Sequence, residues 1–161
     1  MLIAAVYYAL GGFEKPGIQI VNVGNYYLAG NHYSGKYNSR ELGDLFEKYR
    51  RIIGNGETKG ILTIINNKEA EADGRVDYSI GILTDPRTWI RTDSSMQMIT
   101  IKASRAVRVT IAAHNLVMPD PGEVRESVEA FAVKEGLKLE GYSIEKYISD
   151  RNLEIDFPVK Q

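Results

Sequence analysis

The chain has 161 residues, of which 43% are hydrophobic and 25% charged, and this composition is typical of one soluble globular domain. Its 20 Lys and Arg residues are balanced by 21 Asp and Glu residues, so it lacks the basic excess of a nucleic-acid-binding surface and no direct nucleic-acid partner is expected. The chain has no cysteine, which excludes disulfides, thiolate nucleophiles and cysteine-ligated metal sites.

An apolar run interrupted only by glycines occupies residues 1–13. It is shorter than the roughly twenty apolar residues that span a bilayer, and it lacks the basic start and cleavage site of a signal peptide. Three interpretations stay open: an element packed on the domain, the remnant of a membrane anchor, or a disordered tail. Gly11, Gly12 and Pro16 predict a hinge, so residues 1–16 are expected to form a separate segment whose deletion leaves the melting temperature nearly unchanged. The domain itself is then expected in the cytoplasm or tethered to a membrane.

The first half of the domain is predicted to run strand, strand, helix, strand, strand. Residues 18–29 have high β propensity, and Asn38 followed by Glu41 has the spacing of a capping box at the start of a helix over residues 38–53. The apolar positions of this helix share one face: Leu42, Leu45, Phe46, Tyr49, Ile52 and Ile53. Strands are predicted over residues 60–65 and, from strict alternation, over residues 76–82.

The second half repeats this order. Alternating apolar residues predict strands near residues 99–101 and 107–111, and Asp120, Pro121 and Glu123 mark the start of a helix that Gly136 ends. Strands over residues 141–147 and 153–159 complete the half.

The two halves align at an offset of about eighty residues. Ile18 falls on Ile99, Leu28 on Val109 and Gly60 on Gly141, and one offset held over a whole half indicates a duplication. We therefore predict an α+β fold built from a duplicated β-β-α-β-β unit, with repeats over residues 17–83 and 98–160 joined by a linker over residues 84–97. The alternative is a pair of unrelated α+β halves.

Three short motifs on this frame resemble those of gyrase-inhibitor-like (GyrI-like) effector-binding domains, which have a SOUL/SH2-like duplicated fold. Residues 27–37 (YLAGNHYSGKY) resemble the family pattern aG-x-h-Y-x-G-x-Y, residues 77–81 (DYSIG) resemble d-Y-x-x-G, and residues 143–147 (SIEKY) resemble f-E-x-Y. The resemblance covers residues 17–160. It implies two SH2-like repeats, antiparallel sheets with two long helices around a central cleft, and binding of amphipathic or cationic small molecules in that cleft.

The sequence also departs from this family. Residues 113–119 (AHNLVMP) stand where the second repeat should carry H-x-G-p-y, and only His114 is kept. The residues before the domain show no winged-helix pattern, so we expect that the resemblance does not extend to the family's transcription factors. Some relatives carry a single N-terminal membrane helix instead, among them a eukaryotic ER-phagy receptor, which gives the apolar run a membrane-anchor interpretation.

Glu145 is the leading candidate site residue. Strand alternation places Ser143, Glu145 and Tyr147 on one face, and a carboxylate there lies either on a solvated face or in a functional cavity. The resemblance favours the cavity, because the family uses a Glu at this position to receive cationic ligands. Desolvation would raise the pKa of such a carboxyl, which suits a general base in the relatives that hydrolyse reactive electrophiles.

Aromatic side chains are the candidates for the cleft walls, with ordinary core packing as the alternative for each. With Glu145 they form the predicted ligand-binding set: Tyr147, Tyr33, Tyr37, Tyr78 and Trp89. His32 and His114 are predicted to be hydrogen-bonded sheet residues, because two histidines without an acidic cluster make a poor metal site. No metal and no cofactor are expected.

These observations favour a small-molecule-binding module for an amphipathic or cationic effector over an enzyme. One alternative is a hydrolase of strained, cyclopropane-bearing electrophiles with Glu145 as general base. The other is a membrane-tethered protein-interaction domain, whose protein partner the sequence does not identify.

Overall fold

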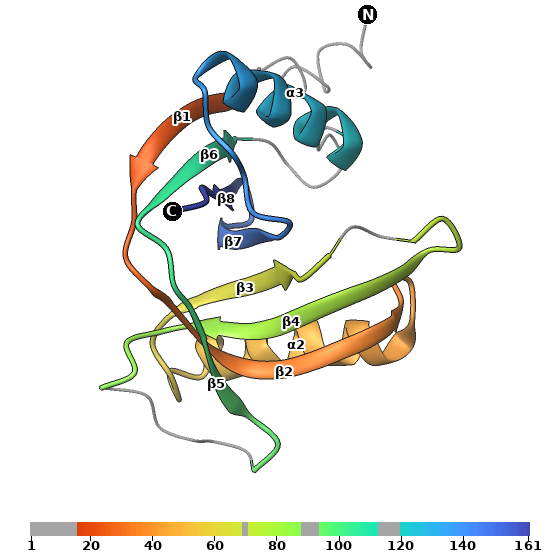
Figure 1. The fold of residues 1–161 in the computed structure, drawn as a ribbon. Helices are drawn as coiled ribbons and strands as arrows, with labels where there is room; N and C mark the ends of the chain where they lie inside the picture. Colours follow the sequence, from red (N-terminus) through yellow and green to blue (C-terminus); the bar gives the residue numbers. More distant parts are fainter. Residues whose placement is uncertain (1–15, 69–70, 88–93, 113–119) are drawn as a thin grey trace, which may run out of the picture.

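In the computed structural model of the chain, the described residues form one antiparallel sheet of eight strands with two helices packed on it (Figure 1). The structure describes residues 16–68, 71–87, 94–112 and 120–161. The apolar N-terminal run, Trp89 and His114 lie outside these ranges. Within the ranges, no helix is both long enough and apolar enough to cross a membrane.

The helices and strands follow the predicted order along the chain. The strands are β1 Gly17–Asn22, β2 Tyr26–Lys36, β3 Ile61–Asn66, β4 Arg75–Leu83, β5 Gln97–Ile101, β6 Arg105–Ile111, β7 Ser143–Ser149 and β8 Asn152–Pro158, and the helices are α2 Arg40–Gly54 and α3 Pro121–Lys134. The extended stretch predicted over residues 18–29 is thus two strands, β1 and the start of β2.

The strand order is β1-β6-β8-β7-β3-β4-β2-β5, with antiparallel pairing throughout. The counterparts in the two halves are β1 and β5, β2 and β6, β3 and β7, and β4 and β8. When each strand is replaced by its counterpart, the same strand order results in the reverse direction. The halves join through β3 and β7, and the first strand of each half pairs with the second strand of the other, so their sheets form one continuous sheet. The α+β class is confirmed, and this order is consistent with the predicted duplication.

Both helices begin at a capping side chain. The Oγ of Ser39 accepts a hydrogen bond from the Leu42 amide, so the N-cap of α2 is Ser39 and the capping box predicted at Asn38 is wrong by one residue. Asp120 caps α3 as predicted, accepting from the Gly122 amide at 2.8 Å. The apolar faces of the two helices cover separate cores on the sheet.

The sheet is strongly bent. Gly30 on β2 pairs directly with Gly81 on β4, and a Cβ at either position would collide with a backbone carbonyl of the neighbouring strand. The absence of side chains there permits the close approach. The bend brings the Tyr26 hydroxyl within 2.8 Å of Asp156 on β8, although three strands lie between β2 and β8 in the sheet. The face opposite the helices is therefore concave.

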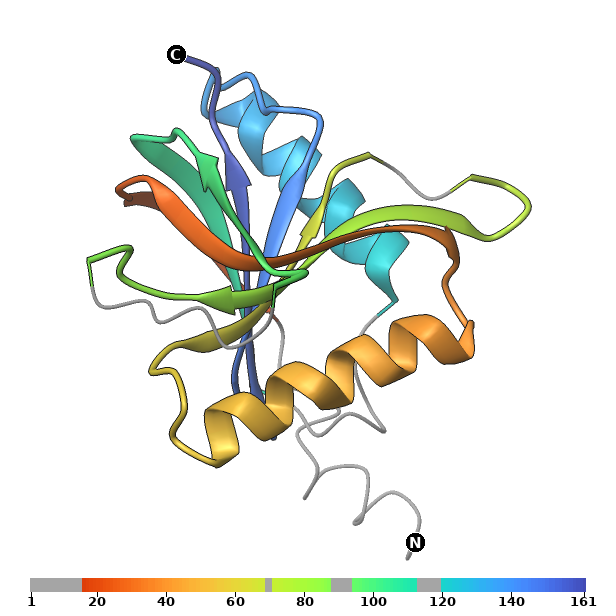
Figure 2. The same cartoon turned by 90° about the horizontal axis from the view of Figure 1, so that it is seen from below.

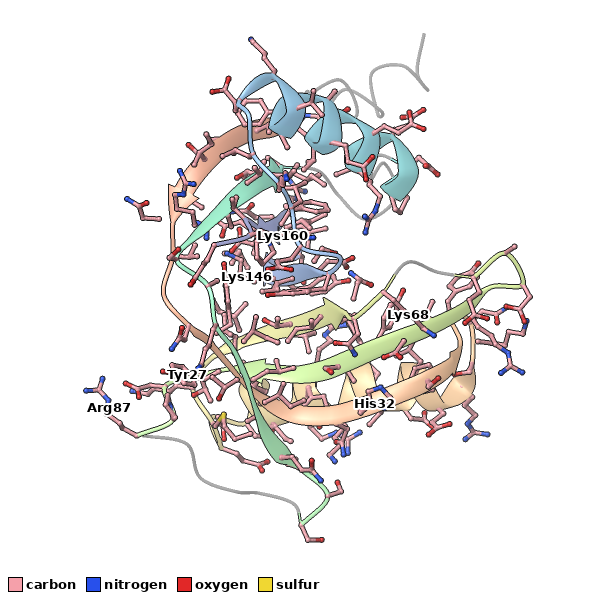
Figure 3. All side chains as sticks on the ribbon, in the orientation of Figure 1. Tyr27, His32, Lys68, Arg87, Lys146 and Lys160 are labelled. Carbon is pink, nitrogen blue, oxygen red and sulfur yellow. The ribbon has the colours of Figure 1, made fainter. Side chains whose placement is uncertain are left out.

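A buried charge network lies on this concave face. The Asp156 carboxylate, fully buried, accepts hydrogen bonds from Arg108 at 2.7 and 3.0 Å and pairs with Lys146 at 2.8 Å. Lys146, which is labelled in Figure 3, has a side chain that is only 6% exposed. It also pairs with Glu154 at 2.8 Å. Two cations and two carboxylates on β6, β7 and β8 thus balance one another in charge. The Tyr26 hydroxyl on β2 joins this network by its hydrogen bond to Asp156.

Candidate ligand-binding site

The junction of β3 and β7 lies between the two helices, which stand apart from each other on the sheet (Figure 2). Ile64 on β3 pairs with Glu145 on β7, which pairs with Ile155 on β8, and residues directly opposite each other share one face. Ile64 belongs to the core under α2 and Ile155 to the core under α3. Glu145 therefore lies on the helix-bearing face at the middle of the sheet, where neither core closes over it.

The Glu145 side chain is half-buried and hydrogen-bonded at both oxygens. Asn66 donates its amide to Oε1 at 2.6 Å, and the Tyr147 hydroxyl donates to Oε2 at 3.2 Å. Burial raises the pKa of Glu145 above the ordinary glutamate value, and these two hydrogen bonds act against the rise. In the described part of the chain, no Lys or Arg forms an ion pair with this carboxylate. Glu145 is thus a desolvated acid without a fixed counter-charge among the residues that the structure describes.

A cavity of about 450 Å³ opens in front of Glu145. Strands β3, β4, β7 and β8 form its floor and the first turns of α3 form one wall. Its lining is mainly apolar or aromatic, with three charged side chains: Asn66, Lys68, Tyr78, Pro121, Gly122, Val124, Arg125, Ser143, Glu145, Ile155 and Phe157. Its volume and lining are typical of a small-molecule site.

Tyr147 contacts Glu145 but is not among the residues that line this cavity. Its ring meets the Phe46 ring edge-on, with centroids 5.3 Å apart, and it packs against both helix cores. Burial and the Glu145 carboxylate raise its pKa, so it remains a hydrogen-bond donor at physiological pH. Tyr147 lines a pocket of about 300 Å³, under the C-terminal end of α2.

The other predicted aromatic residues lie at different places. Tyr78 lines the cavity of Glu145, and burial together with the Glu145 charge raises its pKa. Tyr33 is buried and donates to the Lys36 carbonyl at 2.7 Å, away from the lining residues. Tyr37 is 65% exposed at the end of β2. Of the predicted aromatic residues that the structure describes, Tyr78 alone lines this cavity. Tyr147 donates a hydrogen bond to Glu145 from outside the lining, and Tyr33 and Tyr37 lie elsewhere.

His32 lies on β2 with its Nε2 atom 2.9 Å from Asp77, in the hydrogen-bonded position predicted for it (Figure 3). Across the four described ranges, no group of three or more histidine or acidic side chains is placed to hold a metal ion.

Several lining residues were not predicted from the sequence. Asn66, Lys68, Arg125 and Phe157 come from segments far apart in the chain, and no motif links them. The only local signal is the change from an apolar strand to two polar residues, Asn66 and Asn67, and this change alone does not indicate a binding site. Their positions depend on the β3–β7 pairing and on the placement of α3.

The chain matches no protein-family model and no curated protein sequence. Solved structures share its fold. The structure of SAV2435 bound to tetraphenylphosphonium matches with a TM-score of 0.51 at 18% identity, covering 89% of this chain and 94% of that one. A hydrolase encoded by lin2189 from Listeria innocua matches with a TM-score of 0.60 at 13% identity, over 96% of this chain and 98% of that one.

The C-terminal domain of EcmrR matches with a TM-score of 0.64 at 11% identity, over 92% of this chain and 99% of that one. At these identities the likeness establishes a common fold along almost the whole chain. The neighbours thus include a protein with a bound small organic cation and a protein named as a hydrolase.

Proposed function

We propose that this chain is a GyrI-like small-molecule-binding module that receives an amphipathic or cationic effector in the cavity at Glu145. The observation that supports this most is a desolvated carboxylate, hydrogen-bonded by Asn66 and Tyr147, at the floor of a cavity with a mainly apolar lining. A bound cation would supply the counter-charge that this carboxylate does not have within the described ranges.

The lining suits an organic cation with an aromatic body. Tyr78 and Phe157 border the cavity with Glu145, and aromatic faces attract cations as well as apolar groups. A small inorganic cation would gain little from this apolar lining, because it would lose its hydration shell there. That SAV2435, which shares the fold, is described with tetraphenylphosphonium bound makes that cation a suitable probe.

The experiment is a calorimetric titration of the protein with tetraphenylphosphonium. Glu145→Gln keeps the shape of the side chain and removes its charge, so it should weaken binding by about 1–3 kcal/mol, the usual contribution of a charge-assisted contact. The neutral analogue triphenylphosphine oxide should bind the two proteins alike. Glu126→Gln, an exposed carboxylate on α3 outside the cavity lining, is the matched control and should bind the cation as the unmodified protein does. Equal cation affinity with and without the Glu145 charge would refute the proposal.

The raised pKa of Glu145 supports a second candidate, the hydrolase that uses Glu145 as general base. Its Oε2 atom is held by Tyr147, which fixes the carboxylate relative to the cavity. In this case Glu145→Gln should abolish turnover of a cyclopropane-bearing electrophile while leaving its binding largely intact, since a general base acts in the transition state. Loss of binding without any turnover in the unmodified protein would favour the binding module.

A further inference from the structure

The charges around the cavity are not those of a site made for a cation alone. Among the lining residues that the structure describes, Glu145 is the only carboxylate, whereas Lys68 and Arg125 contribute two positive charges. Both cations would repel a purely cationic ligand, and the repulsion is strongest where the surroundings exclude water. Building on the proposed function, we propose that the ligand is amphoteric: its cationic group meets Glu145, and an anionic group such as a carboxylate meets Lys68 and Arg125.

The two cations lie toward the opening of the cavity and Glu145 lies on its floor. The Lys68 side chain is 55% exposed and follows the end of β3, as Figure 3 shows, and the Arg125 side chain is 28% exposed on α3. Glu145 is in the middle of the sheet, opposite Ile64. An elongated ligand that enters past α3 would therefore meet the cations with its trailing end and the carboxylate with its leading end.

The spacing of the charges fits one small molecule. Ile64 lies four residues before Lys68, so their backbones are at most about 13 Å apart, the length of four extended residues, and the chain leaves β3 after Asn66. The Glu145 and Lys68 side chains line the same cavity, which bounds the distance between the two charges. A ligand whose charges are separated by a short alkyl chain can therefore contact both ends.

The ion pair of Lys68 is weak enough to be exchanged for a ligand anion, because Lys68 pairs with Glu71 at 3.2 Å on the exposed surface, where ion pairs contribute little. Arg125 is more buried and pairs with Glu129 at 3.7 Å. The Arg125 guanidinium also lies over the Phe157 ring, with its Cζ atom 5.9 Å from the ring centroid. That contact holds the guanidinium beside the apolar lining, where an anion would be partly shielded from water.

The test compares two ligands that differ only in the anion. A carboxyalkyl triphenylphosphonium is zwitterionic at neutral pH, and its methyl ester is a cation of nearly the same shape. Calorimetric titration should show the acid binding the unmodified protein about tenfold more tightly than the ester, the gain expected of one charge-assisted contact. In Lys68→Gln and Arg125→Gln this advantage should fall below about threefold. Lys134→Gln removes a positive charge on the last turn of α3, outside the cavity lining. This control variant should keep the tenfold advantage of the acid over the ester.

A salt series on the unmodified protein gives a readout that needs no variant. The advantage of the acid over the ester should shrink as salt rises, because screening weakens contacts to the exposed Lys68 most. If both ligands bind equally and Glu145→Gln weakens both, the amphoteric ligand is refuted and the cation site stands. If neither ligand binds, both this proposal and the proposed function are refuted.

Discussion

Replacing Asp156 by Asn should destabilise the protein strongly, although Asp156 lies on the face opposite the candidate cavity. The substitution keeps the side-chain shape but leaves the buried Lys146 and the half-buried Arg108 facing Glu154 alone. Removing one partner from a buried ionic network typically costs about 3–5 kcal/mol. A domain of this size has about 5–15 kcal/mol of unfolding free energy in total, so the loss would be a large share of it.

Urea unfolding at neutral pH, followed by circular dichroism, measures this loss as a lower midpoint with an unchanged slope. Asp44→Asn is the control, because Asp44 forms an exposed pair with Arg40 at 3.7 Å and should lose less than about 0.5 kcal/mol. A loss below about 1 kcal/mol for Asp156→Asn would show that the network does not hold β6, β7 and β8 together.

The pH dependence of the unmodified protein gives an independent check on Asp156. Burial alone would raise its pKa, but the hydrogen bonds from Arg108, Lys146 and Tyr26 outweigh burial and hold the pKa below the ordinary aspartate value of about 3.9. A carboxyl whose pKa is lowered by folding stabilises the fold above its unfolded-state pKa. That contribution is then lost as the pH falls through the folded-state pKa. The difference between the unmodified protein and Asp156→Asn should therefore narrow in acid below about pH 4.

Three smaller predictions concern single side chains. Tyr147→Phe removes a hydroxyl that donates to Glu145 and should raise the Glu145 pKa further. When the pH is lowered, tetraphenylphosphonium binding should therefore be lost at a higher pH in this variant than in the unmodified protein. Because burial raises the Glu145 pKa, the charged carboxylate destabilises the fold at pH values above that pKa. At alkaline pH the urea midpoint of Glu145→Gln should therefore be higher than that of the unmodified protein. The difference between the two midpoints should vanish as the pH falls toward about 4. Ser39→Ala should cost about 1 kcal/mol of unfolding free energy, whereas Asn38→Ala should change it by only a few tenths, because Ser39 caps α2.

The elements could be predicted from the sequence because their signals are local. Alternation along residues 76–82 and the apolar face of the first helix depend only on near neighbours, and both elements appear as expected. The N-cap was misplaced because Asn38 and Ser39 are both capping residues. Only the structure shows which of the two side chains reaches the Leu42 amide.

The candidate site could be predicted only in part, because a cavity is made by contacts between distant segments. Alternation along residues 143–147 placed Glu145 and Tyr147 on one face, and the structure has them hydrogen-bonded. It did not show that Asn66 would be paired opposite Ser143, within 2.6 Å of the carboxylate, since that depends on the register of β3 against β7. The position of Arg125 over Phe157 likewise depends on how α3 sits on the sheet.

In the predicted alignment of the two halves, Glu145 falls on a residue that is also its cross-strand partner in the sheet. At the offset that aligns Ile18 with Ile99, the counterpart of Glu145 is Ile64, and these two residues are direct cross-strand partners at the centre of the sheet. If both positions carried a carboxylate, the two charges would face each other on adjacent strands with Cβ atoms about 5 Å apart, and like charges at that position are destabilising. An acid at one position therefore favours an apolar residue at the other. Ile64→Glu should accordingly raise the pKa of the coupled pair, lower the urea midpoint at alkaline pH and restore part of the loss in acid, where one carboxyl holds a proton. A midpoint that is the same at both pH values would show that the two side chains do not face each other, and the register that places Glu145 in the cavity would be wrong.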